Sequence, residues 1–349
     1  MPFINDRLAA NRTLIAEQPT RGKARQSRFR FEPAQVMDHL RQRIVGQAPA
    51  LQAISDLLQV IKAELAPEER PLGVCLLMGP TGVGKTETVR QLAIAIHGNA
   101  DALCRIDMNT LSQAHYASAL TGAPPGYVGS KEGHTLYDAE RIRGSYSKPG
   151  IVLFDELEKA SPDVIRSLLN VLDSGWLTLP AGNQQIDFRN ALIFMTSNLG
   201  ARELARYQSR FERGWLRLFR PRPERQQHLL EQALQQHFDP EFINRIDSIL
   251  HYQPLPENQV QALWQLELAH LNRRLARQQV QLSVSPEAMR WLQQDYDPRY
   301  GARDLARIIK SQLAPAVAAA LLANAETTLL HAELSGGRLV VSAQPSTRA

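Results

Sequence analysis

The sequence predicts an α/β protein with a parallel sheet, followed by a smaller, mainly helical domain with short strands. Short apolar segments without polar interruptions, typical of strands buried on both faces, alternate with segments of helical periodicity. The pattern changes after Pro254-Leu255-Pro256, where a long helical segment begins. With 349 residues, the chain has the length of about two domains.

The first part of the chain is expected to hold the parallel sheet. Helices are expected from Pro33 to Leu65, with a break at Val45-Gly46-Gln47, and from Glu87 to His97. Residues 1–32 are polar and basic, so we expect a flexible arm there, ahead of a large domain over residues 33–254. The expected strands are Leu72–Met78, Leu103–Asp107, Ile151–Asp155, Ala191–Thr196 and Ser248–Tyr252.

Residues 255–349 are expected to form the small domain. Within it, Pro315 lies in an apolar helical segment and should kink the helix, because proline cannot donate the helical hydrogen bond. The expected elements are a helix over 257–279, a strand over Val280–Val284, a helix from Pro286, a helix over Asp304–Ala323, and a hairpin of Leu329–Leu334 and Leu339–Val341.

The composition excludes several classes of protein. Hydrophobic residues make up 44% and charged residues 21%, as in globular domains. We find neither an uninterrupted apolar run of about 18–20 residues nor a secretory signal, so we expect no membrane association and a cytoplasmic location. Cys75 and Cys104 lie in apolar runs without metal-ligand spacing, so we expect small core residues in a reducing compartment.

The net charge of +5 is concentrated in two basic segments. Residues 21–30 carry five basic residues and no acid, and residues 201–225 carry eight arginines and three glutamates. Either segment could attract nucleic acid or an acidic protein partner. The alternative is an ordinary solvated surface.

A complete phosphate-binding motif, G-x-x-x-x-G-K-[ST], lies between the first strand and the helix after it. Its glycines let backbone N–H groups surround phosphate oxygens, and the helix directs its positive dipole end at them. Lys85 would neutralise phosphate charge, and the hydroxyl of Thr86 would bind Mg²⁺. The motif consists of Gly79, Pro80, Thr81, Gly82, Val83, Gly84, Lys85 and Thr86.

Polar residues follow two further apolar strands. Asp155 and Glu156 come at the end of one strand, at the sheet edge where open α/β folds bind ligands. Asp155 would hold Mg²⁺ and Glu156 would polarise the attacking water, because phosphoryl transfer needs mainly positioning and charge stabilisation. Asn198 follows the next strand, where its amide could hold that water. By themselves, the acids could equally cap a helix, and Ser197-Asn198 could be an ordinary turn.

Seven segments match one protein family in chain order. They are Gly79–Thr86, Gly122–Gly129, Val152–Lys159, Asp187–Asn190, Met195–Gly200, Pro240–Asp247 and Tyr300–Arg303. On these segments, the chain resembles the Clp-type AAA+ ATPases, and most of all the second ATPase module of the ClpB disaggregases. The resemblance implies an AAA+ P-loop domain with a small lid domain, binding of ATP and Mg²⁺, and a hexameric ring that threads polypeptide through its pore.

The resemblance also implies roles for individual residues. Asn198 matches sensor I, Arg303 matches sensor II, and Val45 lies where the adenine pocket begins. Arg245 matches the arginine finger, which one subunit supplies to the γ-phosphate of its neighbour, so the site is completed by oligomerisation. In the matching pore loop, Tyr127 and Val128 would contact the substrate polypeptide.

The leading functional hypothesis is therefore an ATP-dependent unfoldase or remodelling chaperone. One alternative is a nucleic-acid-linked AAA+ loader or regulator, which the pI of about 9.3 suits, although we find no helix-turn-helix or zinc-finger motif. Another is an ATPase that needs an activating partner. Coupling to a Clp peptidase is disfavoured, because we find no Ile-Gly-Phe or Ile-Gly-Leu docking loop. The chain also carries one ATPase module, whereas ClpB-like proteins usually carry two.

Residues 201–225 have the pattern of a basic amphipathic helix, weakened by Gly214. Arginines recur at steps of three or four, and apolar residues recur on a different face. Such a helix could pack on its own domain with a solvated arginine face, or it could dock an acidic protein partner or nucleic acid. The arginines are Arg202, Arg206, Arg210, Arg213, Arg217 and Arg220, and the apolar residues are Leu204, Tyr207, Phe211, Trp215 and Leu218.

Overall fold

A computed structural model of the chain describes most of its residues, and these form two compact units. The large unit comprises the chain up to Gly79 together with Lys85–Tyr252, and the C-terminal unit comprises Pro80–Gly84 and the chain from Gln253. The described residues are 27–111, 137–179, 184–209, 211, 223–255, 257–324 and 326–344.

The large unit is built on a five-stranded, entirely parallel sheet in the order β2-β3-β6-β1-β7. Every residue of β1, β3 and β6 is buried, which explains their continuous apolar sequence. The predicted fold class is confirmed, and each strand coincides with an expected one. The strands are β1 (Gly73–Met78), β2 (Leu103–Asp107), β3 (Gly150–Asp155), β6 (Ala191–Ser197) and β7 (Ser248–His251).

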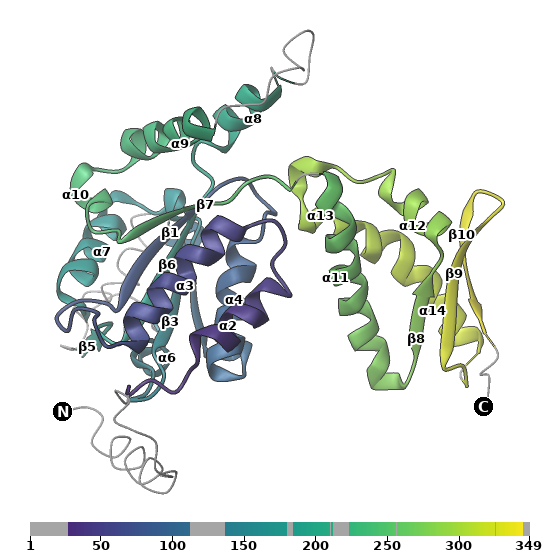
Figure 1. Ribbon diagram of the computed structural model, residues 1–349, viewed down its shortest axis with the longest axis horizontal. Helices are drawn as coiled ribbons and strands as arrows, with labels where there is room; N and C mark the ends of the chain where they lie inside the picture. The colour runs from purple at the N-terminus through teal and green to yellow at the C-terminus, as the bar shows by residue number, and fades with distance from the viewer. Residues whose placement is uncertain are drawn as a thin grey trace, which may run out of the picture. The chain divides into compact units, whose positions relative to one another are not determined.

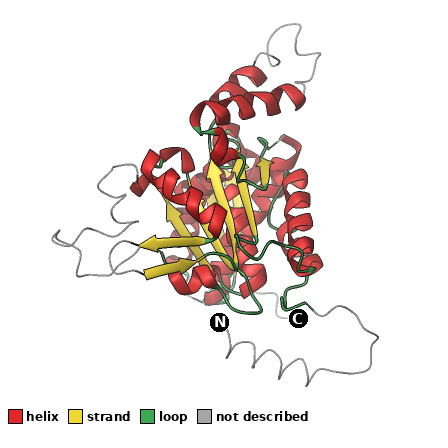
Figure 2. Cartoon of the chain, turned by 90° about the vertical axis from the view of Figure 1, so that its left-hand side faces the viewer, coloured by secondary structure: helices red, strands yellow, loops and turns green. Residues whose placement is uncertain are grey.

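Helices cover both faces of this sheet (Figures 1 and 2). The core between the layers contains large side chains from strands, loops and helices alike, and those of Phe154, Phe188 and Phe242 are inaccessible to solvent. The helices are α2 (Pro33–Arg41), α3 (Ala48–Lys62), α4 (Lys85–His97), α6 (Ala139–Arg143), α7 (Pro162–Ser174), α8 (Ala201–Ser209), α9 (Pro223–His237) and α10 (Pro240–Ile243), with 3₁₀ turns η1 (Ala100–Ala102), η2 (Met108–Leu111) and η3 (Leu157–Lys159).

The segment from Ser27 to Glu32, expected as the end of a flexible arm, packs onto the large unit. Phe29 and Phe31 are 2% and 6% exposed. The ammonium of Lys62 donates to the carbonyls of both phenylalanines at 2.8 and 2.9 Å, and forms an ion pair with Glu32. Burial of two aromatic rings outweighs the basic character of this stretch.

Two further features of the large unit differ from the sequence expectation. An antiparallel hairpin of β4 (Trp176–Leu179) and β5 (Gln184–Asp187) follows α7 and was not expected. The predicted amphipathic helix of residues 201–225 corresponds to α8, which ends at Ser209, and its remainder up to Pro223 lies outside the described residues except for Phe211. Leu204 of α8 is buried in the core of the large unit, as expected for a helix that packs on its own domain.

The C-terminal unit contains the expected helices and short strands. Its three-stranded sheet has the order β10-β9-β8, and Trp264 is fully buried in its core. A π-helical turn, η8 (Ile309–Leu313), lies before Pro315, so the expected irregularity takes this form. The remaining elements are α11 (Glu257–Leu275), η6 (Ala276–Gln278), β8 (Gln281–Val284), α12 (Pro286–Gln293), η7 (Pro298–Tyr300), α13 (Ala302–Ile308), α14 (Ala314–Ala323), β9 (Leu329–Ser335) and β10 (Arg338–Ala343).

The helical stretch Ala302–Ala323 is long and apolar enough to cross a membrane, judged by length and composition alone. A search for uninterrupted apolar runs does not detect it, because charged residues interrupt it. Leu305, Leu313 and Val317 of this stretch are buried in the core of the C-terminal unit. One third of the apolar window in this stretch is buried, so packing in that core accounts for part of its apolar composition.

Candidate nucleotide-binding site

The glycine-rich loop between β1 and α4 has a backbone that requires glycine. Gly79, Gly82 and Gly84 have φ angles of +144°, +81° and +103°. A Cβ atom at position 79 would lie 2.3 Å from the carbonyl oxygen of Tyr252. Other side chains would therefore be excluded by both strain and contact. The loop leads into the N-terminus of α4, where backbone N–H groups can bind an anion.

Within the C-terminal unit, the same loop contacts the turn before α13. A Cβ atom at Gly82 would lie 1.9 Å from the carbonyl oxygen of Tyr300. The amide of Ala302 donates a hydrogen bond to the carbonyl of Gly82 at 3.0 Å. Arg303, the expected sensor II residue, is the next residue along and is exposed.

The structure places Lys85 and Asn198 in direct contact. The ammonium of Lys85 donates to Oδ1 of Asn198 at 2.9 Å and to the carbonyl oxygen of Gly79. Lys85 is only 7% exposed, so these oxygens help to compensate a buried positive charge. Phosphate oxygens can replace such ligands when a nucleotide enters. Glu158 holds the backbone of Asn198, because its Oε1 accepts a hydrogen bond from the backbone N–H of Asn198 at 3.2 Å.

Asp155 lies beside Thr86, as the sequence predicts. The Asp155 carboxylate is buried and accepts a hydrogen bond from the Thr86 hydroxyl at 3.2 Å. Carboxylate and hydroxyl oxygens are the donors that Mg²⁺ prefers, so this pair fits that ion. Among the residues that the structure describes, no group of three or more His, Cys, Asp and Glu side chains could hold a metal. A metal held by Asp155 and Thr86 would therefore take phosphate oxygens and water as its remaining ligands.

Two further residues bind Asp155, and sequence reasoning missed both. The Thr196 hydroxyl donates to Oδ1 of Asp155 at 2.5 Å, and Nη2 of Arg105 forms an ion pair with Oδ2 at 2.7 Å. Thr196 is the residue of β6 just before Ser197-Asn198, and Arg105 lies on β2. Neither belongs to the phosphate-binding motif, so only the strand order shows that they adjoin Asp155.

Glu156 has a left-handed backbone, with φ at +60° and ψ at +52°. For a residue other than glycine, this conformation costs on the order of 1 kcal/mol. It is held by a hydrogen bond from the Glu156 amide to the Thr196 hydroxyl at 2.9 Å. The turn ends β3 abruptly, directly after Asp155.

Arg245 lies in the turn between α10 and β7, where it forms an ion pair with Asp173 of α7. Nη2 of Arg70 fixes this turn by donating to the carbonyl of Arg245 at 3.2 Å and to Asp247 at 2.9 Å. Asp247 also accepts the amide of Val74 in β1 at 2.8 Å. The Arg245 side chain remains 37% exposed, so a rigid turn presents a partly exposed guanidinium.

Val45, Cys75 and Cys104 make none of the contacts described above. Val45 is half-buried in the segment between α2 and α3. Tyr127 and Val128 lie outside the described residues. Cys75 and Cys104 are buried core residues, as predicted. Burial raises the pKa of the Cys75 thiol to about 12 and also raises the pKa of Cys104, so neither is suited to nucleophilic chemistry.

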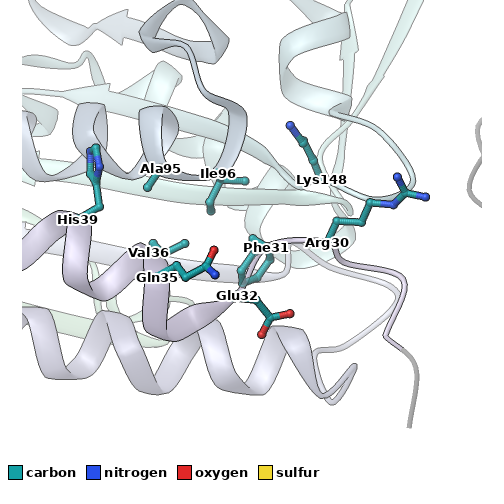
Figure 3. A pocket seen from close by; sticks show the side chains of 9 residues that line it. All are labelled: Arg30, Phe31, Glu32, Gln35, Val36, His39, Ala95, Ile96 and Lys148. Atoms are coloured by element: carbon teal, nitrogen blue, oxygen red, sulfur yellow. The ribbon is translucent and has the colours of Figure 1, made fainter. Parts of the chain in front are cut away.

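A separate cavity of about 300 Å³ lies between α2 and α4 (Figure 3). Ala95 and Ile96 line it at the end of α4, about 16 Å along the helix from Lys85. Figure 3 shows Arg30 and Lys148 pointing in different directions, so these two cations do not converge on a ligand. The phosphate-binding loop therefore remains the best candidate site.

Two family comparisons divide the chain near the boundary between the units. Residues 70–249 match the family described as "AAA domain (Cdc48 subfamily)". Residues 255–329 match the family described as "C-terminal, D2-small domain, of ClpB protein". The first match contains the loop, the acidic pair, Asn198 and Arg245.

Two similar proteins have nearly the same length as this chain. The "ATP-dependent protease ATP-binding subunit-like protein AmiB" of Pseudomonas aeruginosa is 46% identical over 92% of this chain and 93% of its own. An "ATP-dependent protease ATP-binding subunit-like protein" of Rhodococcus erythropolis is 41% identical over 99% of this chain and 100% of its own. The "Chaperone protein ClpB" of Meiothermus ruber is 40% identical over 86% of this chain, which spans 34% of that protein.

Proposed function

The chain belongs to the Clp-type AAA+ ATPases, and from this premise we propose that it is a ring-forming, ATP-dependent protein unfoldase or remodelling chaperone. Its AAA domain binds ATP and implies ATP hydrolysis. The observation that carries the proposal is a pair of contacts at the carboxyl ends of three neighbouring strands, Lys85 with Asn198 and Thr86 with Asp155. Similarity to ClpB over 86% of the chain supports a polypeptide substrate.

In the proposed mechanism, these side chains act on the phosphates, the attacking water and the metal ion. Lys85 neutralises the β- and γ-phosphates, while Asn198 orients the γ-phosphate and the attacking water. Glu156 polarises that water from the end of β3. Asp155 and Thr86 would hold Mg²⁺, which would supply neutralisation of phosphate charge. Catalysis would then come mainly from positioning and from charges fixed in advance.

We further propose that neighbouring subunits complete the site. Arg245 would reach the γ-phosphate bound by the next subunit, a role supported by its partly exposed guanidinium on a rigid turn. Arg303 would act as sensor II from the C-terminal unit. AAA+ ATPases of the Clp type generally form rings, and we propose a homohexamer. Tyr127 and Val128 would grip the substrate in the pore, a role supported by the sequence match of their loop.

The decisive experiment traps the protein with ATP and polypeptide bound. The Glu156→Gln variant should bind ATP, hydrolyse it slowly, form ring-sized particles and retain a labelled, permanently unfolded polypeptide. Lys85→Ala is the matched control and should do none of these. Particle mass, turnover and polypeptide binding are measured on the same samples. A protein that stays monomeric at saturating ATP, and whose wild type never turns over with any candidate activator, would contradict the proposal.

A second candidate is an ATPase that needs a partner. The names of the two full-length relatives favour it, because both describe an ATP-binding subunit-like protein of an ATP-dependent protease. The readout is the basal rate: turnover that stays low with unfolded polypeptide and rises when a partner protein is added supports this candidate over the autonomous unfoldase.

A further inference from the structure

Arg105 forms an ion pair with the carboxylate that we propose as a magnesium ligand. Its Nη2 lies 2.7 Å from Oδ2 of Asp155. The parallel register pairs Arg105 with Leu153 and Asp107 with Asp155. Side chains two residues apart on a strand share a face, so Arg105 projects from the same face of the sheet as Asp155 and reaches it along the strand direction.

The surroundings of Asp155 need a positive charge. The carboxylate side chain is 7% exposed, and an uncompensated buried charge is strongly unfavourable. The hydroxyls of Thr196 and Thr86 donate to Oδ1, but both are neutral. The guanidinium of Arg105 supplies the positive charge at Oδ2. A divalent cation bound at Asp155 would supply the same compensation.

The Arg105 side chain is also placed so that its guanidinium can move away from Asp155. It lies on β2, which is an edge strand of the sheet, and its side chain is 51% exposed. A long arginine side chain can turn its charged end into water while its stem stays on the protein. A magnesium ion beside Asp155 would repel the guanidinium, whereas it would leave the hydroxyls of Thr86 and Thr196 in place.

We infer that Arg105 is a stand-in cation, which neutralises Asp155 in the nucleotide-free state and is displaced when magnesium and nucleotide bind. This inference rests on the proposed role of Asp155 as a magnesium ligand. Because binding must break the ion pair, Arg105 raises the magnesium concentration that the site needs. It thereby disfavours magnesium without a nucleotide, since phosphate oxygens are needed to outcompete it.

A permanent contact between Arg105 and Asp155 predicts a change of opposite sign in the magnesium requirement. If Arg105 stayed on Asp155 in the loaded site and merely positioned it, removing Arg105 would weaken magnesium binding. The sign of one measurement therefore separates a displaced cation from a permanent positioning residue.

The test measures the magnesium requirement of nucleotide binding. A fluorescent ATP analogue is titrated onto the full chain at a series of Mg²⁺ concentrations, in a Glu156→Gln background that conserves the nucleotide. Arg105→Gln should lower the half-saturating Mg²⁺ concentration roughly fivefold to tenfold, because a charge-assisted contact no longer competes. Arg105→Lys should give a smaller shift of the same sign and serves as the readout if Arg105→Gln does not fold. An unchanged or raised requirement in both variants overturns the inference.

Two controls complete the design. Arg141→Gln removes an arginine of similar exposure, which pairs with Asp138 at 2.9 Å, and should leave the requirement unchanged. In EDTA without nucleotide, Arg105→Gln should also lower the thermal midpoint by more than Arg141→Gln does, and an equal effect counts against the inference.

The Asp155→Asn variant distinguishes failure of the proposed metal ligand from failure of the stand-in cation. If it leaves the magnesium dependence intact, the proposed metal ligand is wrong. If it removes that dependence while Arg105→Gln has no effect, only the stand-in cation is wrong.

Discussion

The hydroxyl of Thr196 on β6 accepts a hydrogen bond from the backbone amide of Glu156 at the end of β3, at 2.9 Å. The same hydroxyl donates to Asp155. One proton and two lone pairs allow a threonine hydroxyl to do both. A single side chain on the neighbouring strand thus contacts the carboxylate of Asp155 and holds the backbone of Glu156, so Thr196 acts as a positioning residue.

The first prediction concerns this hydroxyl. Thr196→Val keeps the shape of the side chain but leaves the Glu156 amide without its acceptor, so kcat should fall about tenfold or more. The affinity for ATP should change little, because the phosphate loop is untouched. Steady-state kinetics and nucleotide titration measure the two effects. Thr196→Ser should restore most of the turnover, and a Val variant as fast as wild type would refute the assignment.

The second prediction concerns Asn198. Asn198→Ala removes the Oδ1 acceptor that contacts Lys85, together with the amide proposed to orient the attacking water. Turnover should fall by one to two orders of magnitude, while ATP affinity should stay within about threefold, since other groups still bind the phosphates. Loss of ATP binding as large as that of Lys85→Ala would instead indicate a role in binding.

The third prediction tests whether the site is shared between subunits. Arg245→Ala should bind ATP without turning it over, and Lys85→Ala should not bind ATP. Mixed rings of the two variants should regain activity, because the Lys85 variant offers an intact Arg245 to neighbours with an intact loop. Turnover is followed as the mixing ratio changes. Full activity of Arg245→Ala alone, or inactive mixed rings, would contradict a shared site.

The fourth prediction concerns Asp173, whose carboxylate pairs with Arg245. Without it the guanidinium is less ordered, so Asp173→Ala should lower kcat roughly threefold to tenfold without changing ATP affinity. Asp163→Ala is the matched control, because Asp163 forms an exposed ion pair with Arg166 on the same helix. Exposed pairs contribute little, so this control should match wild type. Equal rates for both variants would exclude a positioning role for Asp173.

The strands of the fold could largely be predicted because burial on both faces leaves a continuous apolar segment. β1, β3 and β6 illustrate this directly. The β4–β5 hairpin was missed because its strands are short and alternate. Leu177 and Ile186 are buried while Thr178 and Gln185 face outward, so a search for alternation could have found it.

The residues of the candidate site likewise divide into those that the sequence predicts and those that it does not. Lys85, Thr86 and Asp155 could be predicted because motif spacing and strand ends specify them. Arg105 and Thr196 could not, because their contacts with Asp155 depend on β2 and β6 lying on either side of β3. Strand order is a property of the folded sheet, and hydrophobic periodicity carries no information about it.

The hydrogen bonds from Lys62 to the carbonyls of Phe29 and Phe31 have a practical consequence for the design of shortened variants. Cutting the chain at Pro33, where the first helix begins, would discard two buried rings and uncover the apolar surface beneath them. A chain that begins at Ser27 would keep both phenylalanines and the hydrogen bonds that join their carbonyls to Lys62 of α3.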